Sequence, residues 1–369
     1  MSGGLPPGRF FLPGPTEVDA EVLAAQVTAM YGHRTDACRA VLREVDEGLR
    51  PFFGTTRPVL IGTLSATGFM EAAVRSGTRA SVLSVVNGAF SGRFAQIAER
   101  CGRSVERLDV PWGRAIDPEV LDRRLSRGGV DAVTVVHSET STGALAPLAA
   151  IGEVVGRYPD VLLLVDSVTG VGATPVRAED WGLDVVLTGS QKGLAMPPGL
   201  AFAAVSERLL ERARDLPDRG YYLDLVRYVE RADDAQTPTT PALTLLHAAR
   251  EQAHRMRAET PDGRFARHRA LADACASAVG RWRAGGMDVS VLAPVGERSP
   301  TVTCIELPPV RGGPEVVAGV RERGYVIGGG YGRLEQRTIR IGHMGDHSLE
   351  ALAGVLEAVE AELHPGLRA

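Results

Sequence analysis

The chain has 369 residues, more than one typical hydrophobic core holds, which favours two domains. Its formal net charge of −4 argues against nucleic acid or an anionic membrane as a partner and favours a small metabolite. The cysteines are widely spaced without a CxxC pair, so they indicate neither a disulfide framework nor a structural zinc site, and no metal is expected. Because no apolar stretch approaches the roughly 20 residues that span a bilayer, and residues 1–15 lack the profile of a signal peptide, we expect a cytoplasmic protein.

Residues 1–16 are rich in glycine and proline, which predicts an extended N-terminal arm rather than a helix or a strand. A first helix is expected over residues 17–30 and a second over 36–53, where Asp36 is a candidate N-cap. His33 and Arg34 lie in the loop between these helices. The sequence leaves open whether they contact a substrate or are solvated.

A short apolar strand over 59–62 is followed by small residues and then by a helix that is expected from Phe69 onward. The small residues include Ser65, Ala66 and Thr67. Backbone N–H groups at this position, together with the helix dipole, form a candidate phosphate site. The spacing of a nucleotide P-loop is absent.

Two further strands end in loops that carry candidate site residues. The strand over 81–86 is followed by Phe90, whose ring either lies on a heterocycle or joins the core, and then by a helix over 94–100. The strand over 132–137 leads into a hydroxyl-rich loop that contains Glu139 and Thr140. We interpret Glu139 as structural.

The chain is organised around two buried parallel strands. The apolar run 162–165 ends in Asp166, and the next apolar run ends in the loop 188–193, which contains Gln191 and Lys192. The ends of such strands meet at one rim, where open α/β sheets bind ligands. A desolvated lysine there has a lowered pKa and can form a Schiff base with a carbonyl, while a buried aspartate can keep a pyridine nitrogen protonated. The alternative is that Asp166 caps a helix and Lys192 is solvated.

Beyond the helix break at 260–263 the pattern changes to short strands that alternate with helices, which predicts a small α+β domain. Arg340 lies on one face of an alternating strand over 338–341, where an arginine is commonly solvated. The glycine-rich segment 328–332 is expected to be a mobile loop.

The segment DSVTGVGATPVRAEDWGLDVVLTGSQKGLAMPPG, residues 166–199, closely resembles the cofactor segment of class V aminotransferases, especially the alanine–glyoxylate and serine–glyoxylate group. The resemblance covers most of the chain and implies the α/β fold type I of pyridoxal phosphate-dependent transferases. That fold joins a large domain with a mostly parallel seven-stranded sheet to a smaller α+β C-terminal domain. We therefore expect the arm at 1–16, the large cofactor-binding domain at 17–260 and the small domain at 261–369.

The resemblance also implies roles for individual residues. Lys192 and Asp166 are the implied catalytic pair, with Lys192 carrying pyridoxal 5′-phosphate, and Arg340 binds the substrate α-carboxylate. The implied cofactor-binding residues are Ser65, Ala66, Thr67, Phe90, Thr140, Asp166, Gln191, Lys192 and Thr239. Thr239 reaches the phosphate from the neighbouring subunit, which implies a homodimer with shared active sites. Phe90 stands where many relatives have tryptophan, and Gln236 where many have tyrosine.

Together these features predict a pyridoxal phosphate-dependent aminotransferase with a ping-pong mechanism. It would move an amino group from a small amino acid of the alanine or serine type to a 2-oxo acid such as glyoxylate or pyruvate. Alternatives on the same scaffold are 2-aminoethylphosphonate transamination, cysteine desulfuration and a lyase reaction. Desulfuration needs a mobile thiol, whereas Cys304 lies inside an apolar strand. A cofactor-binding regulator without turnover is a further alternative, which the lack of a basic DNA-binding segment disfavours.

Overall fold

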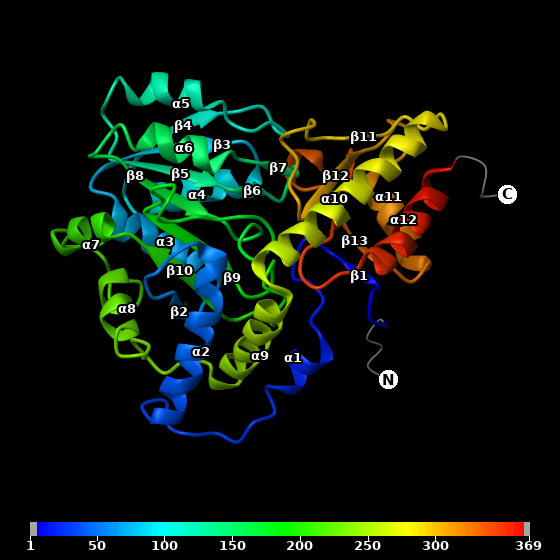
Figure 1. Cartoon of the computed structure of the whole chain (residues 1–369). Helices are drawn as coiled ribbons and strands as arrows, with labels where there is room; N and C mark the ends of the chain where they lie inside the picture. The colour runs from blue at the N-terminus through cyan, green and yellow to red at the C-terminus, as the bar shows by residue number, and fades with distance from the viewer. Residues whose placement is uncertain (1–5, 365–369) are drawn as a thin grey trace.

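The structure is a computed structural model that describes residues 6–364 (Figure 1). Its larger part is built on a seven-stranded sheet with strand order β2-β10-β9-β8-β5-β3-β4. These strands are β2 (Leu60–Gly62), β3 (Ser81–Val86), β4 (Ser104–Asp109), β5 (Ala132–Val136), β8 (Leu162–Asp166), β9 (Val185–Gly189) and β10 (Ala201–Val205). All neighbours pair in parallel except β10, which is antiparallel to both β9 and β2. The expected sheet is therefore confirmed.

Helices cover both faces of this sheet. Consecutive residues of β8 point to opposite faces: Leu163 joins one hydrophobic core and Leu164 the other. On the Leu163 side lie α2 (Asp36–Phe53), α5 (Pro118–Leu125), α6 (Leu148–Val155) and α9 (Leu243–Glu259). On the Leu164 side lie α3 (Ala66–Gly77), α4 (Ala89–Arg100), α7 (Glu207–Arg214) and α8 (Leu225–Ala232). Because both faces are covered, every residue of β5, β8, β9 and β10 is buried.

The C-terminal part forms a second sheet with strand order β1-β13-β14-β12-β11, beside the first (Figure 1). Its strands are β1 (Phe10–Phe11), β11 (Ser290–Val291), β12 (Val302–Glu306), β13 (Val326–Gly329) and β14 (Thr338–Gly342). The helices α10 (Pro261–Ala284), α11 (Gly313–Glu322) and α12 (Leu349–Leu363) pack around it, with a short 3-10 turn at Gly332–Leu334. This is the expected α+β arrangement.

The two parts have separate hydrophobic cores, and α10 passes from one to the other. Phe265 near its start belongs to the core that contains Leu163, whereas Leu271 and Trp282 belong to the core of the second sheet. Only Thr260 separates α9 from α10. We propose that the domain boundary lies at Thr260, as predicted, with the first turns of α10 still seated on the large domain.

Several elements differ from the expected ones. The first helix, α1, spans only Ala20–Ala24, α3 begins at Ala66 and α4 begins at Ala89, so Phe90 lies in a helical turn rather than in a loop. The arm contains the strand β1, which pairs in parallel with β13, while residues 1–5 of the arm and 365–369 of the small domain lie outside the described residues. A small hairpin of β6 (Ser138–Glu139) and β7 (Ala144–Leu145) follows β5.

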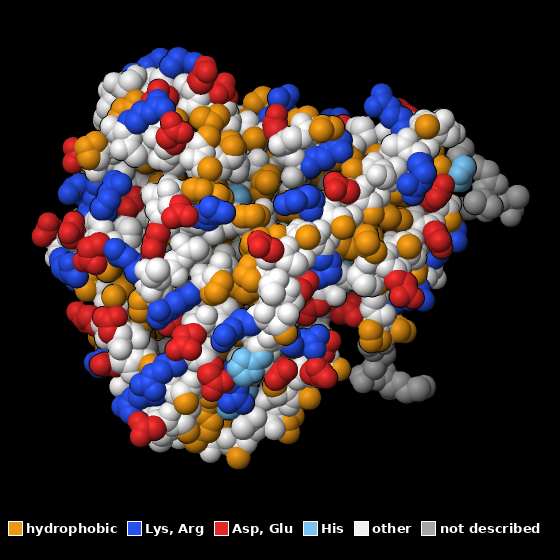
Figure 2. Space-filling model, viewed as in Figure 1, with side chains coloured by type: hydrophobic (Ala, Val, Ile, Leu, Met, Phe, Trp, Pro, Cys, Tyr) orange, Lys and Arg blue, Asp and Glu red, His pale blue; other side chains and the backbone are white. Residues whose placement is uncertain are grey.

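Acidic and basic side chains are interspersed over the face of the molecule in Figure 2, without a large area of one sign. This distribution agrees with the small net charge of −4. Within residues 6–364, no helix is long and apolar enough to cross a membrane.

Candidate active site

Asp166 is the last residue of β8 and lies at the carboxyl edge of the seven-stranded sheet. Its side chain is 4% exposed, and Oδ1 accepts a hydrogen bond from the N–H of Val168 at 2.8 Å. Burial raises the pKa of Asp166 from 3.8 to about 7, and the Glu139 carboxylate adds to the rise, while Lys192 acts against it. The residue is therefore a buried acid that is poised to keep or release a proton near neutral pH.

Lys192 follows the neighbouring strand β9 and lies close enough to Asp166 for the two charges to interact. Its Nζ donates a hydrogen bond to the carbonyl oxygen of Pro13 at 2.9 Å. Burial lowers the pKa of the Lys192 amine from 10.5 to about 8, and the positive charges of Arg340 and Arg93 act in the same direction, while Asp166 opposes them. The acid and the amine predicted from the strand ends thus share one buried region.

Lys192 is also the only lysine in the sequence, and the other 40 basic residues are arginines. Arginine does not lose its proton in proteins, whereas a buried lysine can become a neutral amine. The single lysine therefore indicates a function at this edge that needs an amine able to lose its proton, which arginine cannot provide. This signal is present in the sequence, although the motif interpretation does not use it.

The N-terminal arm lies directly against Lys192. The N–H of Thr16 donates to the carbonyl of Gln191 at 3.0 Å, and Pro13 accepts the lysine bond. Gly14 has φ +113°, and a Cβ at this position would lie 2.0 Å from Lys192 Nζ. Glycine is therefore required at residue 14, because a side chain there would occupy the space of the amine.

The start of α3 forms the candidate anion site. Ser65 is the N-cap residue, but its side chain makes no capping hydrogen bond, and Ser65 and Thr67 are exposed while Ala66 is buried. The buried Oε1 of Gln191 has no hydrogen-bond partner in the described part of the chain. A Cβ placed on Gly189 would lie 3.1 Å from this oxygen and 3.4 Å from the Cβ of Ala66, so the Gln191 amide lies near the first turn of α3. Ser65, Ala66, Thr67 and Gln191 are thus brought together.

Arg340 lies in β14 of the second sheet and faces the same region. Its Nε donates to the carbonyl of Gly329 at 2.7 Å and its Nη1 to the carbonyl of Thr140 at 3.3 Å. The side chain is 9% exposed, its pKa is lowered by burial, and no carboxylate within residues 6–364 forms an ion pair with it. The hydroxyl of Thr140 lies 3.3 Å from that of Thr169. The guanidinium is therefore held by two carbonyls, and Nη2 forms no hydrogen bond among residues 6–364.

Phe90 lies in the first turn of α4, half-buried beside Tyr331. The two ring centroids are 5.4 Å apart with an interplanar angle of 30°, and the guanidinium carbon of Arg93 lies 4.9 Å from the Phe90 centroid. Arg93 also donates to the Tyr331 hydroxyl at 3.3 Å. The sequence analysis missed Arg93 and Tyr331, because the contact joins two segments that are far apart in the chain.

Glu139 is fully buried and accepts five hydrogen bonds. They come from the N–H groups of Phe90 and Ser91, the hydroxyl of Ser91, and the N–H and hydroxyl of Ser141. Two of these donors are unpaired N–H groups of the first turn of α4, which the carboxylate caps. These contacts are those of a structural residue, as predicted.

Thr239 is the one predicted cofactor residue that this single chain does not bring to the others. Its carbonyl accepts from the hydroxyl of Thr237, and Arg34 Nη1 donates to the Gln236 amide oxygen at 2.5 Å and to the Thr237 carbonyl at 3.0 Å. Among residues 6–364, no hydrogen bond links Thr239 to the start of α3. The predicted role of Thr239 in a partner subunit stays a prediction.

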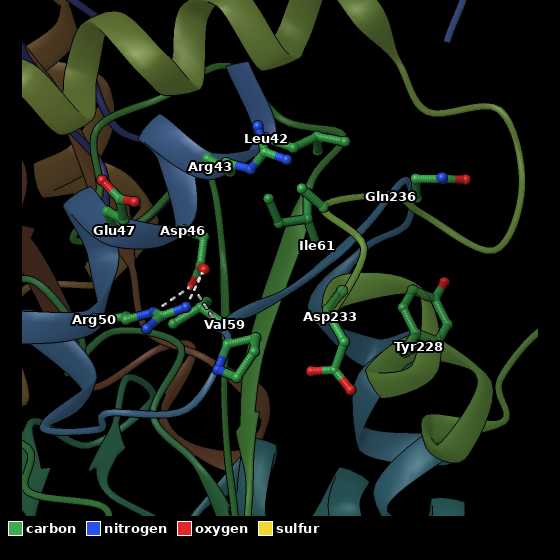
Figure 3. A pocket seen from close by; sticks show the side chains of 13 residues that line it. Leu42, Arg43, Asp46, Glu47, Arg50, Val59, Ile61, Tyr228, Asp233 and Gln236 are labelled. Carbon is green, nitrogen blue, oxygen red and sulfur yellow. Dashed lines mark hydrogen bonds and ion pairs between the residues drawn. The ribbon is translucent and has the colours of Figure 1, made fainter. Parts of the chain in front are cut away.

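A surface pocket of about 260 Å³ lies beside this segment, between α2, β2 and α8 (Figure 3). Its lining includes Tyr228 and Gln236, and on its other side Arg50 forms an ion pair with Asp46, which also accepts the N–H of Val59. None of the predicted site residues lines it. The pocket is therefore separate from the region around Lys192.

The donor set at the carboxyl edge fits the cofactor that the resemblance implies. A phosphate suits the uncapped helix start at Ser65 and the unpartnered Gln191 amide. An aldehyde suits the partly neutral amine of Lys192. A basic ring nitrogen suits the Asp166 carboxylate, which accepts one hydrogen bond from the part of the chain that the structure describes. The individual roles of these residues stay predictions.

Comparison with known proteins identifies the family. Residues 20–272 match the family described as aminotransferase class V. An uncharacterized aminotransferase of Methanocaldococcus jannaschii is 37% identical over 95% of this chain and 91% of its own length. A serine–glyoxylate aminotransferase of Methylorubrum extorquens is 30% identical over 97% of this chain and 92% of its own length. The crystal structure of an alanine–glyoxylate aminotransferase from Nostoc sp. has a TM-score of 0.91 at 28% identity, covering 99% of this chain and 97% of that chain.

These matches extend over both sheets and across the segment that joins Asp166 to Lys192. The predicted family, fold class and cofactor are thereby confirmed. The chain belongs to the class V aminotransferases and is a pyridoxal phosphate-dependent aminotransferase of fold type I.

Proposed function

We propose that this aminotransferase moves the amino group of a small amino acid of the alanine or serine type to a 2-oxo acid such as glyoxylate or pyruvate, in two half-reactions. The observation that carries the proposal is the buried pair of Asp166 and Lys192, whose pKa values are about 7 and about 8. A buried acid and a buried amine that both titrate near neutral pH are typical of acid–base catalysis.

Bound pyridoxal phosphate supplies an aldehyde carbon that accepts the amino group and a ring that takes up the electrons released at the substrate Cα. Lys192 would hold the cofactor at its aldehyde, and the amine, once free, would move the proton of the substrate Cα. Its lowered pKa makes the neutral amine roughly two to three orders of magnitude more abundant at pH 7 than for an ordinary lysine. Asp166 would hold the ring nitrogen in its protonated form, since a positive charge beside the carboxylate favours its ionised form.

Arg340 binds the α-carboxylate of the substrate through Nη2 and the remaining N–H of Nη1. The carbonyls of Gly329 and Thr140 fix the plane of its guanidinium, which supports a two-point bond to a carboxylate. At the other end, the start of α3 and Gln191 would hold the phosphate. The substrate would thus be fixed at its carboxylate, and Lys192 would serve its Cα.

The donor class rests on the relatives, which are named for serine–glyoxylate and alanine–glyoxylate transfer. A screen of amino donors against 2-oxo acids tests it. Alanine or serine with glyoxylate or pyruvate is expected to give the highest kcat/KM. A donor added without an acceptor is expected to bleach the pyridoxal absorbance, because a ping-pong enzyme completes the first half-reaction alone. Absorbance that changes only when both substrates are present would contradict the two half-reactions.

Cysteine desulfuration is disfavoured by the state of the thiols. Cys304 is 1% exposed, and burial raises its pKa to about 12, so it is neither mobile nor a thiolate at neutral pH. The same screen would detect it as sulfide and alanine formed from cysteine. Aminoethylphosphonate as the best donor, or an elimination product, would replace our proposal by one of the other reactions.

We also propose that the enzyme is a homodimer in the cytoplasm. The side chains of Val27 and Met30 are 90% and 71% exposed in a single chain, and they follow α1 on the arm side of the molecule. A partner subunit would cover them and would bring its Thr239 to the phosphate. The four cysteines are free and buried, which suits a reducing compartment. Sedimentation of the wild type and of Val27→Asp tests the dimer: a monomeric wild type would contradict it.

A further inference from the structure

Arg264 is a buried arginine that contacts the loops on which the predicted catalytic residues stand. It lies in the first turn of α10 and is 2% exposed. Its Nε donates to the carbonyl of Gly172 at 2.8 Å, and its Nη2 donates to the carbonyl of Gly193 at 2.9 Å. Gly193 directly follows Lys192, and Gly172 belongs to the turn that follows Asp166.

The two loops meet backbone to backbone at this point. A Cβ on Gly193 would lie 2.5 Å from the carbonyl oxygen of Val171, and a Cβ on Gly172 would lie 3.2 Å from the carbonyl oxygen of Gly193. No side chain of these loops fits between them, so a group from elsewhere must satisfy the two buried carbonyls. The planar guanidinium does so with donors at fixed separation, which sets the distance between the loops.

The third donor group of Arg264, Nη1, reaches Asp346 in the segment that follows Arg340 in the chain. Nη1 lies 2.7 Å from Asp346 Oδ1 and 2.9 Å from Glu259 Oε2. Burial would raise the pKa of the Asp346 carboxyl, but Arg264 and the Gln252 amide reverse the shift and hold it below its ordinary value. Two carboxylates thus neutralise the buried cation and fix the plane of the guanidinium.

A second arginine of the same helix secures this segment. Arg267 donates to the carbonyls of Gly345 and His347 at 3.0 and 2.9 Å, and it forms an ion pair with Glu259 at 2.6 Å. The segment continues the strand that carries Arg340. The start of α10 therefore holds three segments together. They are the turn after Asp166, the loop that contains Lys192, and residues 345–347, which follow β14.

We propose that Arg264 is a positioning residue that sets the spacing of Lys192 from Asp166. The proposal rests on the proposed function, because it concerns the same acid–base pair. Arg264 itself touches no reacting atom. Loss of its fixed donors would let the two loops move relative to each other, and a displacement of about 1 Å at reacting atoms costs about 10²-fold in rate.

A matched control lies at the opposite edge of the sheet. Arg212 of α7 is 6% exposed and also donates to three backbone carbonyls: those of Gly77 and Asp131 through Nη1, and that of Asp160 through Nη2. These residues precede strands β3, β5 and β8, so Arg212 holds the edge that is remote from Lys192. Its replacement separates lost stability from lost positioning.

The experiment compares Arg264→Lys with Arg212→Lys as pyridoxal phosphate-loaded enzymes. Four quantities are measured: Tm, kcat, KM for the donor, and the pH at which the absorbance of the bound pyridoxal group changes form. For Arg264→Lys we expect a kcat lower by about 10–10²-fold, a midpoint moved by at least about half a pH unit and a KM changed less than kcat. For Arg212→Lys we expect a lower Tm with kcat and midpoint near those of the wild type.

The proposal is overturned if Arg264→Lys keeps the wild-type kcat and midpoint, or if both variants lose activity only in proportion to Tm. If Arg264→Lys does not fold, Glu259→Gln carries the test, because it keeps the arginine and its carbonyl bonds but removes one orienting carboxylate. A shifted midpoint with reduced kcat then supports the proposal, and two unchanged values overturn it. An inactive wild type would instead refute the proposed function.

Discussion

Acidic residues at the two edges of the seven-stranded sheet differ in how many hydrogen bonds they form within the protein. At the amino edge, Asp131 precedes β5 and accepts the N–H groups of Arg79, Ala80 and Ser81 at 2.8–3.0 Å. At the carboxyl edge, the Asp166 carboxylate accepts a single hydrogen bond within residues 6–364, although it is more deeply buried. Backbone N–H groups of the protein already occupy the oxygens of Asp131, whereas the oxygens of Asp166 can accept further hydrogen bonds from a ligand.

The carboxyl edge itself contains both kinds of acid. Glu139 and Asp166 are both buried and close enough to influence each other. In the described part of the chain, however, the Glu139 carboxylate accepts five hydrogen bonds and the Asp166 carboxylate one. Burial therefore does not separate a structural acid from a functional one. The number of bonds already made within the protein does, because an under-bonded buried charge is costly unless something binds it.

The largest effect is expected from Lys192→Ala. Removing the only lysine abolishes the pyridoxal absorption band that depends on a covalent link, and it lowers kcat by at least about 10³-fold, since the proton of Cα loses its acceptor. Absorbance spectra and initial rates of the variant check this. Arg214→Ala, which removes an exposed ion pair with Glu207, serves as a control and should behave like the wild type. An intact pyridoxal absorption band in Lys192→Ala would contradict the assignment of ligand binding to the carboxyl edge of the sheet.

Asp166→Asn is expected to lower kcat by about 10²-fold, because the ring nitrogen loses its charged partner. The cofactor-free variant should also be more stable than the cofactor-free wild type near neutral pH. The pKa of Asp166 is raised from 3.8 to about 7 in the folded chain, so between these values the unfolded chain has released a proton that the folded chain keeps. Wild-type stability therefore falls as pH rises from about 4 to about 7, and asparagine removes that loss.

Thermal melts of both cofactor-free proteins at several pH values measure this difference. The gap in Tm in favour of Asp166→Asn should be small at pH 4 and widen up to pH 7. A variant that is less stable than the wild type at pH 7 would place Asp166 among the structural acids.

Arg340→Ala is expected to act mainly on substrate binding. Loss of charge-assisted hydrogen bonds of about 1.5–3 kcal/mol raises KM for amino and oxo acids by about 10–10²-fold, with a smaller fall in kcat. Steady-state kinetics with varied donor measure it. If KM stays unchanged, the α-carboxylate binds elsewhere and Arg340 only supports Gly329 and Thr140.

The smallest catalytic effect is expected from Asp131→Ala at the amino edge. Three backbone N–H groups lose their acceptor, so the free energy of unfolding should fall by about 1–3 kcal/mol while kcat and KM stay near wild-type values. Denaturant unfolding and steady-state kinetics test the pair of outcomes. A change in KM or kcat without loss of stability would show that the two edges are not independent.

The sequence predicts the central sheet and the Asp166–Lys192 pair because the underlying signals are local. Apolar runs mark the buried strands, and parallel strands necessarily bring their last residues to one edge. The family resemblance then adds residues such as Ser65 and Arg340, which no periodicity identifies.

The missed features depend on contacts between distant segments. The segment around Phe90 has the glycine and serine content of a loop, but the carboxylate of Glu139 caps its N–H groups and α4 begins at Ala89. The strand β1 forms because Phe10 pairs with Val326, more than 300 residues later. Arg264 looks like any helical arginine until the fold buries it against two loops. The local sequence pattern around a residue does not identify contact partners that lie far away in the chain.

The most direct test of the account is reductive trapping of the cofactor at different pH values. Cofactor-free protein is mixed with pyridoxal phosphate, reduced with borohydride, and digested for mass spectrometry. We expect one pyridoxyl group on Lys192, attached faster as the pH rises through about 8, because the neutral amine is the reacting form. Protein that remains unmodified at Lys192 at every pH would contradict the claim that a buried, partly neutral lysine opposite Asp166 holds the cofactor.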